Sequence, residues 1–168
     1  VPKVALVLST YPGKKWQIAH AVGLDAIASA AAVATDCSLT EFDLTNIPAR
    51  LENEQILWPV ASYRAALRTL PNKLKNMLTK AWGEPEDDPD VVDNCFRFPA
   101  FREGLSLIAL QPERGRPDIR DEEYHDLGRT PRHSYVAFYL WLQNEDIDAV
   151  IHMGAHGTLE WLPGKSVA

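Results

Sequence analysis

The stretch that decides the fold is IDAVIHMGAHGTLEWLPGK, residues 147–165. Its first part, residues 147–153, is a short apolar run with β-branched side chains, which is typical of a buried strand. The stretch also carries His152, His156 and Glu160, and glycines separate the strand from the last two. Because open α/β sheets bind ligands beyond the carboxyl ends of their strands, the stretch predicts a strand that leads into a functional loop.

Two other apolar runs, Val4–Leu8 and residues 105–110, also predict short strands that are followed by polar loops. If these runs and residues 147–153 are parallel neighbours in one sheet, their carboxyl ends lie at the same edge. The loops that leave the three strands are residues 9–13, 111–116 and 154–164. We therefore expect the three loops to converge on one cleft.

Helices are predicted between these strands. Residues 24–34 are rich in alanine, which has a high helix propensity, and Asp25 in the first turn is favoured by the helix dipole. Residues 133–144 carry apolar side chains on nearly every side, so this helix is expected to be buried. Residues 60–82 repeat apolar side chains near helical spacing, and Pro71 predicts a break between two helices.

Together these elements predict an α/β fold with a mostly parallel sheet and flanking helices. One domain is expected over residues 1–168, with a helical insertion at about 59–82. Residues 83–93 begin with an acidic, proline-rich run that is expected to be a solvated linker because it is too polar to bury. A short strand is expected at 39–44, and residues 45–58 show no sustained period and receive no assignment.

The composition is that of an acidic globular domain with 168 residues, 46% of them hydrophobic. A net charge of -6 argues against a nucleic acid or an anionic membrane surface as the partner, since both would be repelled. No apolar run reaches the ~18 residues that a membrane helix needs, so no membrane span is predicted. Cys37 and Cys95 lack CxxC spacing, which predicts neither a disulfide framework nor a thiolate zinc site and suggests the cytoplasm.

The side chains of His152, His156 and Glu160 form the predicted group that handles protons or a metal ion. If residues 158–162 are helical, His156 and Glu160 share a face because they are four residues apart. Imidazole and carboxylate groups both bind divalent metals and accept protons. The structural alternative is that His156 caps the turn and the helix dipole favours Glu160. His152 lies within the strand and could equally be a hydrogen-bonded histidine of the core.

Four blocks in the chain resemble one known family in type and in order. They are Tyr11-Pro12-Gly13 with residues 17–25, Gln111-Pro112-x-Arg114-Gly115, Tyr124-His125-Asp126 with residues 131–142, and HGTLEWLPGK at residues 156–165. These blocks resemble the large tetrapyrrole-binding subunits of aerobic cobaltochelatase and magnesium chelatase, the CobN/magnesium chelatase H-subunit family. Members of that family are much longer, so the resemblance implies an internal fragment of a larger multidomain subunit.

The resemblance implies a ligase that forms nitrogen–metal bonds. Such a subunit binds hydrogenobyrinic acid a,c-diamide, a metal-free corrinoid, and inserts Co²⁺ as the substrate metal in cobalamin biosynthesis. ATP, with Mg²⁺, would be hydrolysed by separate AAA+ ATPase and MIDAS-type subunits. In agreement, Gly164-Lys165-Ser166 does not complete a Walker A motif, because the motif needs glycine at position 159, where this sequence has Leu159. The resemblance favours cobalt over magnesium as the substrate metal because residues 159–163 read LEWLP, whereas magnesium enzymes more typically have LEFMP there. The alternatives are a magnesium chelatase H-like subunit acting on protoporphyrin IX, or a non-catalytic tetrapyrrole-binding module.

The resemblance also assigns roles to individual residues. His156 and Glu160 are the predicted catalytic groups, and His152, His156 and Glu160 are the predicted ligands of the substrate metal. The residues predicted to contact the tetrapyrrole are Tyr11, His20, Gln111, Arg114, His125, His133 and Trp161. Arginines of the 111–120 loop could pair with ring carboxylates through their planar forks, or the loop could simply be solvated. His20, His125 and His133 could each instead be a capping or surface histidine.

Overall fold

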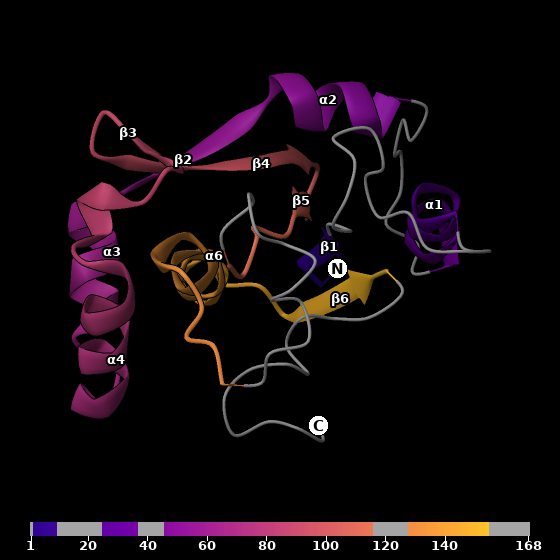
Figure 1. Cartoon of the computed structure of the whole chain (residues 1–168). Helices are drawn as coiled ribbons and strands as arrows, with labels where there is room; N and C mark the ends of the chain where they lie inside the picture. Colours follow the sequence, from indigo (N-terminus) through magenta and orange to yellow (C-terminus); the bar gives the residue numbers. More distant parts are fainter. Residues whose placement is uncertain (1, 10–24, 37–45, 116–127, 155–168) are drawn as a thin grey trace. The chain divides into compact units, whose positions relative to one another are not determined.

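The computed structural model describes residues 2–9, 25–36, 46–115 and 128–154 (Figure 1). The chain forms two compact units. Unit 1 takes its described residues from Val1–Ile56, Pro99–Gln111 and Asp146–Gly157, and unit 2 takes its described residues from Leu57–Phe98 and Pro112–Glu145. Because two such units can belong to one domain, the assignment of a single domain stays a prediction.

Three parallel strands form the centre of unit 1. β1 (Val4–Leu8) lies between β5 (Ser106–Leu110) and β6 (Ala149–Met153) in the strand order. Leu8, at the end of β1, is opposite Leu110 of β5 and Met153 of β6. The three predicted strands and their common direction are therefore confirmed. The expectation that the strand at residues 147–153 is buried is wrong, because β6 is last in the strand order, Ala149 and Val150 are exposed, and residues 151–153 are only partly buried.

The remaining strands make the sheet mixed, so the expectation of a mostly parallel sheet is confirmed in part. β4 (Cys95–Glu103) is antiparallel to β5, β3 (Val91–Val92) is antiparallel to β4, and β2 (Gln55–Pro59) completes the order β2-β4-β5-β1-β6. Gly104, with φ 56°, lies in the two-residue connection between β4 and β5. Such a short connection joins only antiparallel strands. The predicted α/β class holds, and the parallel arrangement is confirmed for β5-β1-β6.

One face of this sheet packs on two helices within unit 1, α1 (Ala26–Asp36) and α2 (Ile47–Asn53). The buried side chains of this core are Val4, Leu6, Leu8, Ala26, Ala30, Ala34, Ile47, Leu51, Phe101 and Ile108. α1 contributes alanines spaced four residues apart, which form one small-residue face of the helix. Asp25 precedes the helix and accepts a hydrogen bond from the backbone N of Ala28 at 2.9 Å, so it acts as the N-cap rather than within the first turn.

Unit 2 contains the helices α3 (Val60–Leu67), α4 (Asn72–Trp82) and α6 (His133–Asn144). The predicted break at Pro71 and the predicted start of α6 are both confirmed. The buried residues of α6 are His133, Ser134, Tyr135, Ala137, Phe138, Leu140, Trp141 and Leu142, which confirms that this helix is enclosed. None of the helices in the part of the chain that the structure describes is long and apolar enough to cross a membrane.

The segments that the sequence left open have different outcomes. Residues 45–58 received no assignment, and they include α2 and most of β2. The expected strand at 39–44 lies outside the described residues. In the acidic segment, residues 83–90, Pro85–Asp87 forms the 3-10 turn η2, and Asp88 is buried. The expectation of a fully solvated linker is wrong at Asp88, because its carboxylate is hydrogen-bonded in the interior of unit 2.

Candidate functional site

The carboxyl ends of β1, β5 and β6 form one edge of the sheet in unit 1. Ser9, the residue after β1, donates its backbone N to Met153 O at 2.9 Å. Gln111, the residue after β5, donates its backbone N to Leu8 O at the same distance of 2.9 Å. The segments that leave the three strands therefore begin next to one another, and the convergence of the three loops on one cleft stays a prediction.

A close approach between Ser9 and Gly154 characterises this edge. A Cβ atom at Gly154 would lie 2.6 Å from Ser9 Cβ and 2.7 Å from Ser9 Oγ, so only glycine fits without displacement. Ser9 is buried, and its Oγ has no hydrogen-bond partner in the described part of the chain. Ser9 is not recognisable from the sequence, because a serine after a strand carries no signal of its own.

His152 lies one residue before the end of β6, opposite Val7 of β1. Its neighbours Ile151 and Met153 pack against the core formed with α1 and α2, so strand alternation places His152 on the other face of the sheet. The side chain is half-buried, and burial lowers the pKa of its imidazole. His152 is consequently neutral at pH 7, the form in which imidazole binds metals. Its assignment as a metal ligand stays a prediction.

Two of the predicted tetrapyrrole contacts, Gln111 and Arg114, are described and buried. The burial of Arg114 excludes the solvated-loop alternative for this arginine. Its carbonyl oxygen accepts a hydrogen bond from the backbone N of Arg132 at 2.9 Å, so its backbone is held within unit 2. Contact of either side chain with a tetrapyrrole stays a prediction.

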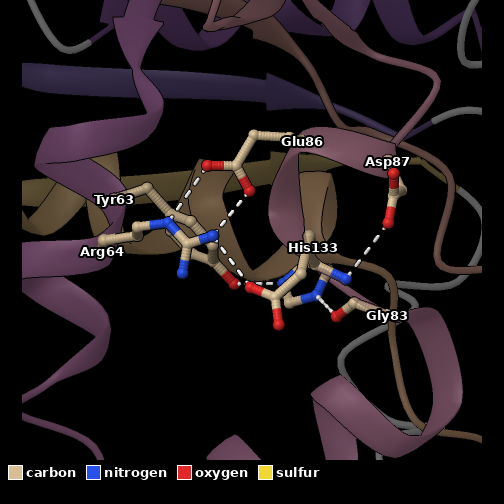
Figure 2. A network of polar contacts seen from close by, with 7 residues as sticks. Tyr63, Arg64, Gly83, Glu86, Asp87 and His133 are labelled. Atoms are coloured by element: carbon tan, nitrogen blue, oxygen red, sulfur yellow. Dashed lines mark hydrogen bonds and ion pairs between the residues drawn. The ribbon is translucent and has the colours of Figure 1, made fainter.

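His133, a third predicted contact, lies in the interior of unit 2 (Figure 2). Its Nε2 is 3.1 Å from Gly83 O, and its Nδ1 is 2.8 Å from the hydroxyl of Tyr63. A carbonyl oxygen only accepts, so Nε2 carries the proton, and Nδ1 accepts a hydrogen bond from Tyr63. Burial lowers the pKa of His133 and raises that of Tyr63, so both groups are neutral at pH 7. His133 therefore links α6 to α3 and to the end of α4.

Charged side chains surround this link. Arg64 of α3 reaches the carboxylates of Glu84 at 2.8 Å and Glu86 at 2.6 Å, and its contact with Glu86 is drawn in Figure 2. Deeper in unit 2, the guanidinium of Arg132 pairs with the carboxylate of Asp90 and lies 3.5 Å from that of Asp88. The acidic run was interpreted from sequence as solvated, so the contacts of the buried Arg132 side chain with Asp88 and Asp90 were missed.

The other predicted site residues are Tyr11, His20, His125, His156, Glu160 and Trp161, and all of them lie outside the described residues. Their catalytic, metal-binding and tetrapyrrole-binding roles stay predictions. Within the described ranges, the structure groups no three His, Cys, Asp or Glu side chains that could hold a metal ion. Of the three predicted metal ligands, His152 is the one that lies within the described residues.

The family model for CobN/Magnesium Chelatase matches residues 2–168 of the chain. The chain belongs to this family of chelatase subunits. It is 31% identical to the aerobic cobaltochelatase subunit CobN of a Sinorhizobium species over 99% of this chain. It is 33% identical to the subunit of the same name from Pseudomonas aeruginosa over 98% of this chain.

A solved structure is also similar, that of the catalytic subunit of cobaltochelatase from Mycobacterium tuberculosis. It matches 99% of this chain with a TM-score of 0.79 and 32% sequence identity. The chain spans 14% and 15% of the two CobN relatives and 16% of the solved chain, so it corresponds to one part of these large proteins.

Proposed function

We propose that the chain is part of a cobaltochelatase large subunit that binds a metal-free corrinoid and inserts Co²⁺ into it during cobalamin biosynthesis in the cytoplasm. The observation that carries the proposal is the convergence of three parallel strands at one edge, directly before the motif with His156 and Glu160. Similarity to cobaltochelatase subunits along nearly the whole chain supports the choice of metal.

Metal insertion requires a site that accepts protons and briefly holds an ion. Each N–H proton inside the ring leaves while Co²⁺ sheds its water ligands, and bonds from the ring nitrogens to Co²⁺ replace the N–H and the Co–water bonds. In the proposal, His156 and Glu160 accept the protons, and together with His152 they bind Co²⁺ before its transfer. The lowered pKa of His152 supports this role, because a neutral imidazole retains the lone pair that binds metal.

The corrinoid would be held by the predicted contacts on the other segments. Arg114 would pair with a ring carboxylate through its fork, and Gln111, Tyr11, His20, His125 and Trp161 would line the remainder of the ring site. Both ring nitrogens of His133 are already hydrogen-bonded, so His133 would contribute by holding α6 in place. AAA+ ATPase and MIDAS-type subunits would hydrolyse ATP, with Mg²⁺, and the rest of the large subunit would complete the site.

The test compares Glu160→Gln with wild type in the full-length protein, assembled with its ATPase partners. Cobalt insertion is followed by the absorbance change of the corrinoid, and corrinoid binding by quenching of tryptophan fluorescence. We expect insertion to be lost and binding to be retained, because the amide can neither accept the proton nor replace the carboxylate charge. Glu52→Gln on the exposed part of α2 is the matched control. Wild-type turnover by Glu160→Gln would refute the catalytic role.

The same preparation distinguishes the alternative functions. Insertion of Mg²⁺ into protoporphyrin IX, with no turnover of Co²⁺ and corrinoid, would identify a magnesium chelatase H-like subunit. Ring binding without ATP-dependent insertion of either metal would identify a non-catalytic tetrapyrrole-binding module.

A further inference from the structure

The beginning of α6 is held by a group of charged side chains in unit 2, of which Arg132 and Asp88 are buried. Arg132 directly precedes the helix, and its side chain is 3% exposed. The guanidinium pairs with Asp90, lies 3.5 Å from Asp88 Oδ1, and donates from Nε to Ser134 Oγ at 2.9 Å. Burying an unpaired charge is costly, so these contacts tie the position of Arg132 to the acidic segment.

Asp88 is the centre of this group, because each of its carboxylate oxygens accepts a separate hydrogen bond. Oδ2 accepts from the backbone N of Ser134 at 2.9 Å, and Oδ1 accepts from the backbone N of Asp90 at 3.0 Å. The residue before α6 provides no side-chain cap, so Asp88 caps the helix from a distant segment. The carboxylate is also favoured by the positive end of the helix dipole.

Arg132 is also hydrogen-bonded, through its backbone, to Arg114, which is one of the predicted tetrapyrrole contacts. The backbone N of Arg132 donates to Arg114 O at 2.9 Å. A second hydrogen bond holds the approach to Arg132, from Trp82 Nε1 at the end of α4 to Thr130 O at 2.9 Å. The acidic segment and α4 therefore fix Thr130 and Arg132, and Arg132 fixes the backbone of Arg114.

We infer that Asp88 and Arg132 are positioning residues for tetrapyrrole binding and act through Arg114. The inference rests on the proposed function, in which Arg114 pairs with a carboxylate of the ring. Arg114 is buried and its carbonyl oxygen accepts from Arg132 N, so a shift of Arg132 would displace the backbone that carries the Arg114 side chain. A bidentate guanidinium–carboxylate pair needs aligned partners, and a small displacement weakens it. The group acts on ring affinity and leaves the metal-transfer step to the residues after β6.

Asp88→Asn is the informative variant. One of the two Asp88 oxygens becomes an NH₂ group, which faces an N–H donor whichever way the amide turns, so one hydrogen bond is lost. The negative charge beside Arg132 is lost as well. Asp93→Asn is the matched control, because its carboxylate is 90% exposed in the next stretch of the chain. Arg132→Lys is the second variant, since it keeps the charge and loses the fork.

The experiment measures KM for the metal-free corrinoid and kcat for Co²⁺ insertion in the full-length protein with its ATPase partners. We expect Asp88→Asn to raise KM roughly tenfold, as for the loss of one charge-assisted hydrogen bond, with kcat within about twofold of wild type. Arg132→Lys shifts KM in the same direction and serves alone if Asp88→Asn does not fold. Asp93→Asn leaves KM unchanged. A fall in kcat at constant KM in the folded variant would overturn the inference.

A double-mutant cycle with Arg114→Gln tests the route of the effect. If Asp88 acts through Arg114, Asp88→Asn changes KM little in the Arg114→Gln background. Full additivity of the two changes would overturn the inference, even if each variant alone raises KM. Failure of the proposed function is seen separately, as wild-type turnover in Glu160→Gln, because that variant leaves the Asp88 group intact.

Discussion

Tyr63→Phe removes one atom from the buried link between α3 and α6. Tyr63 is fully buried, and its hydroxyl is 2.8 Å from His133 Nδ1. The edge-on ring contacts with Phe96 at 5.1 Å and with His133 at 5.7 Å do not involve this oxygen, so they are retained. Because Nε2 is committed to Gly83 O, the imidazole cannot exchange tautomers to rescue Nδ1. The variant therefore leaves a buried acceptor without a donor.

An unsatisfied buried polar group costs about 1–3 kcal/mol. The assay is hydrogen exchange with mass spectrometry in the full-length protein, on peptides that cover α6, because exchange reports the free energy of local opening. The expected loss corresponds to roughly 5- to 150-fold faster exchange of these amides. Acceleration below about twofold would refute the assignment of Nδ1 as an acceptor that depends on Tyr63.

The matched comparison is Tyr63→Phe in a His133→Leu background. There the orphaned nitrogen is absent, so removing the hydroxyl costs less than it does beside the intact histidine. The difference between the two effects is the interaction energy of the Tyr63–His133 hydrogen bond. Equal effects in both backgrounds would assign the loss to the packing of the phenol rather than to the hydrogen bond.

Two further outcomes follow from the burial of the histidines and from the tight edge of the sheet. Burial lowers the pKa values of His133 and His152, so below pH ~6.5 the unfolded chain binds protons that the folded chain does not. The free energy of unfolding therefore decreases as the pH is lowered, by up to about 1.4 kcal/mol per pH unit for each histidine. Melting temperatures between pH 5 and 7.5 check this, and an unchanged slope in His133→Gln would exclude His133 as a source. Gly154→Ala places a Cβ 2.6 Å from Ser9 Cβ and should destabilise the β1–β6 edge by about 1–3 kcal/mol. Hydrogen exchange of β1 and β6 measures the loss, and Ser9→Gly in the same chain should recover most of it if the clash is the cause.

The elements that were predicted correctly are those whose pattern is strong over a short window. β1, β5 and β6 are apolar runs bounded by turn residues, and α6 is apolar on nearly every side because it is enclosed. α2 has only two buried side chains, Ile47 and Leu51, so no period is visible in its seven residues. β4 alternates buried and partly exposed residues, but Pro99 stands in its middle, which argues locally against a strand.

The hairpin turns explain why the expectation of a mostly parallel sheet is confirmed only in part. Asp93 and Asn94, between β3 and β4, both have positive φ, with values of 52° and 57°. Gly104 has φ 56° in the turn between β4 and β5. These residue types tolerate the left-handed region, and two-residue turns of this kind join antiparallel strands. The signal was present in the sequence as Asp-Asn and Gly, but the acidic character of the preceding run favoured a linker.

By itself, the sequence determined the family, the parallel centre of the sheet and the order of strand and motif at residues 147–165, since these depend on local pattern and on side-chain identity. The tertiary structure alone decided that Asp88 caps α6, that Tyr63 and Gly83 fix the tautomer of His133, and that Gly154 lies against Ser9. Each of these contacts joins residues from separate segments of the chain. Hydrophobic period and residue propensity describe neighbours along the chain, whereas a buried hydrogen bond or a steric fit depends on which distant groups folding brings within a few ångströms.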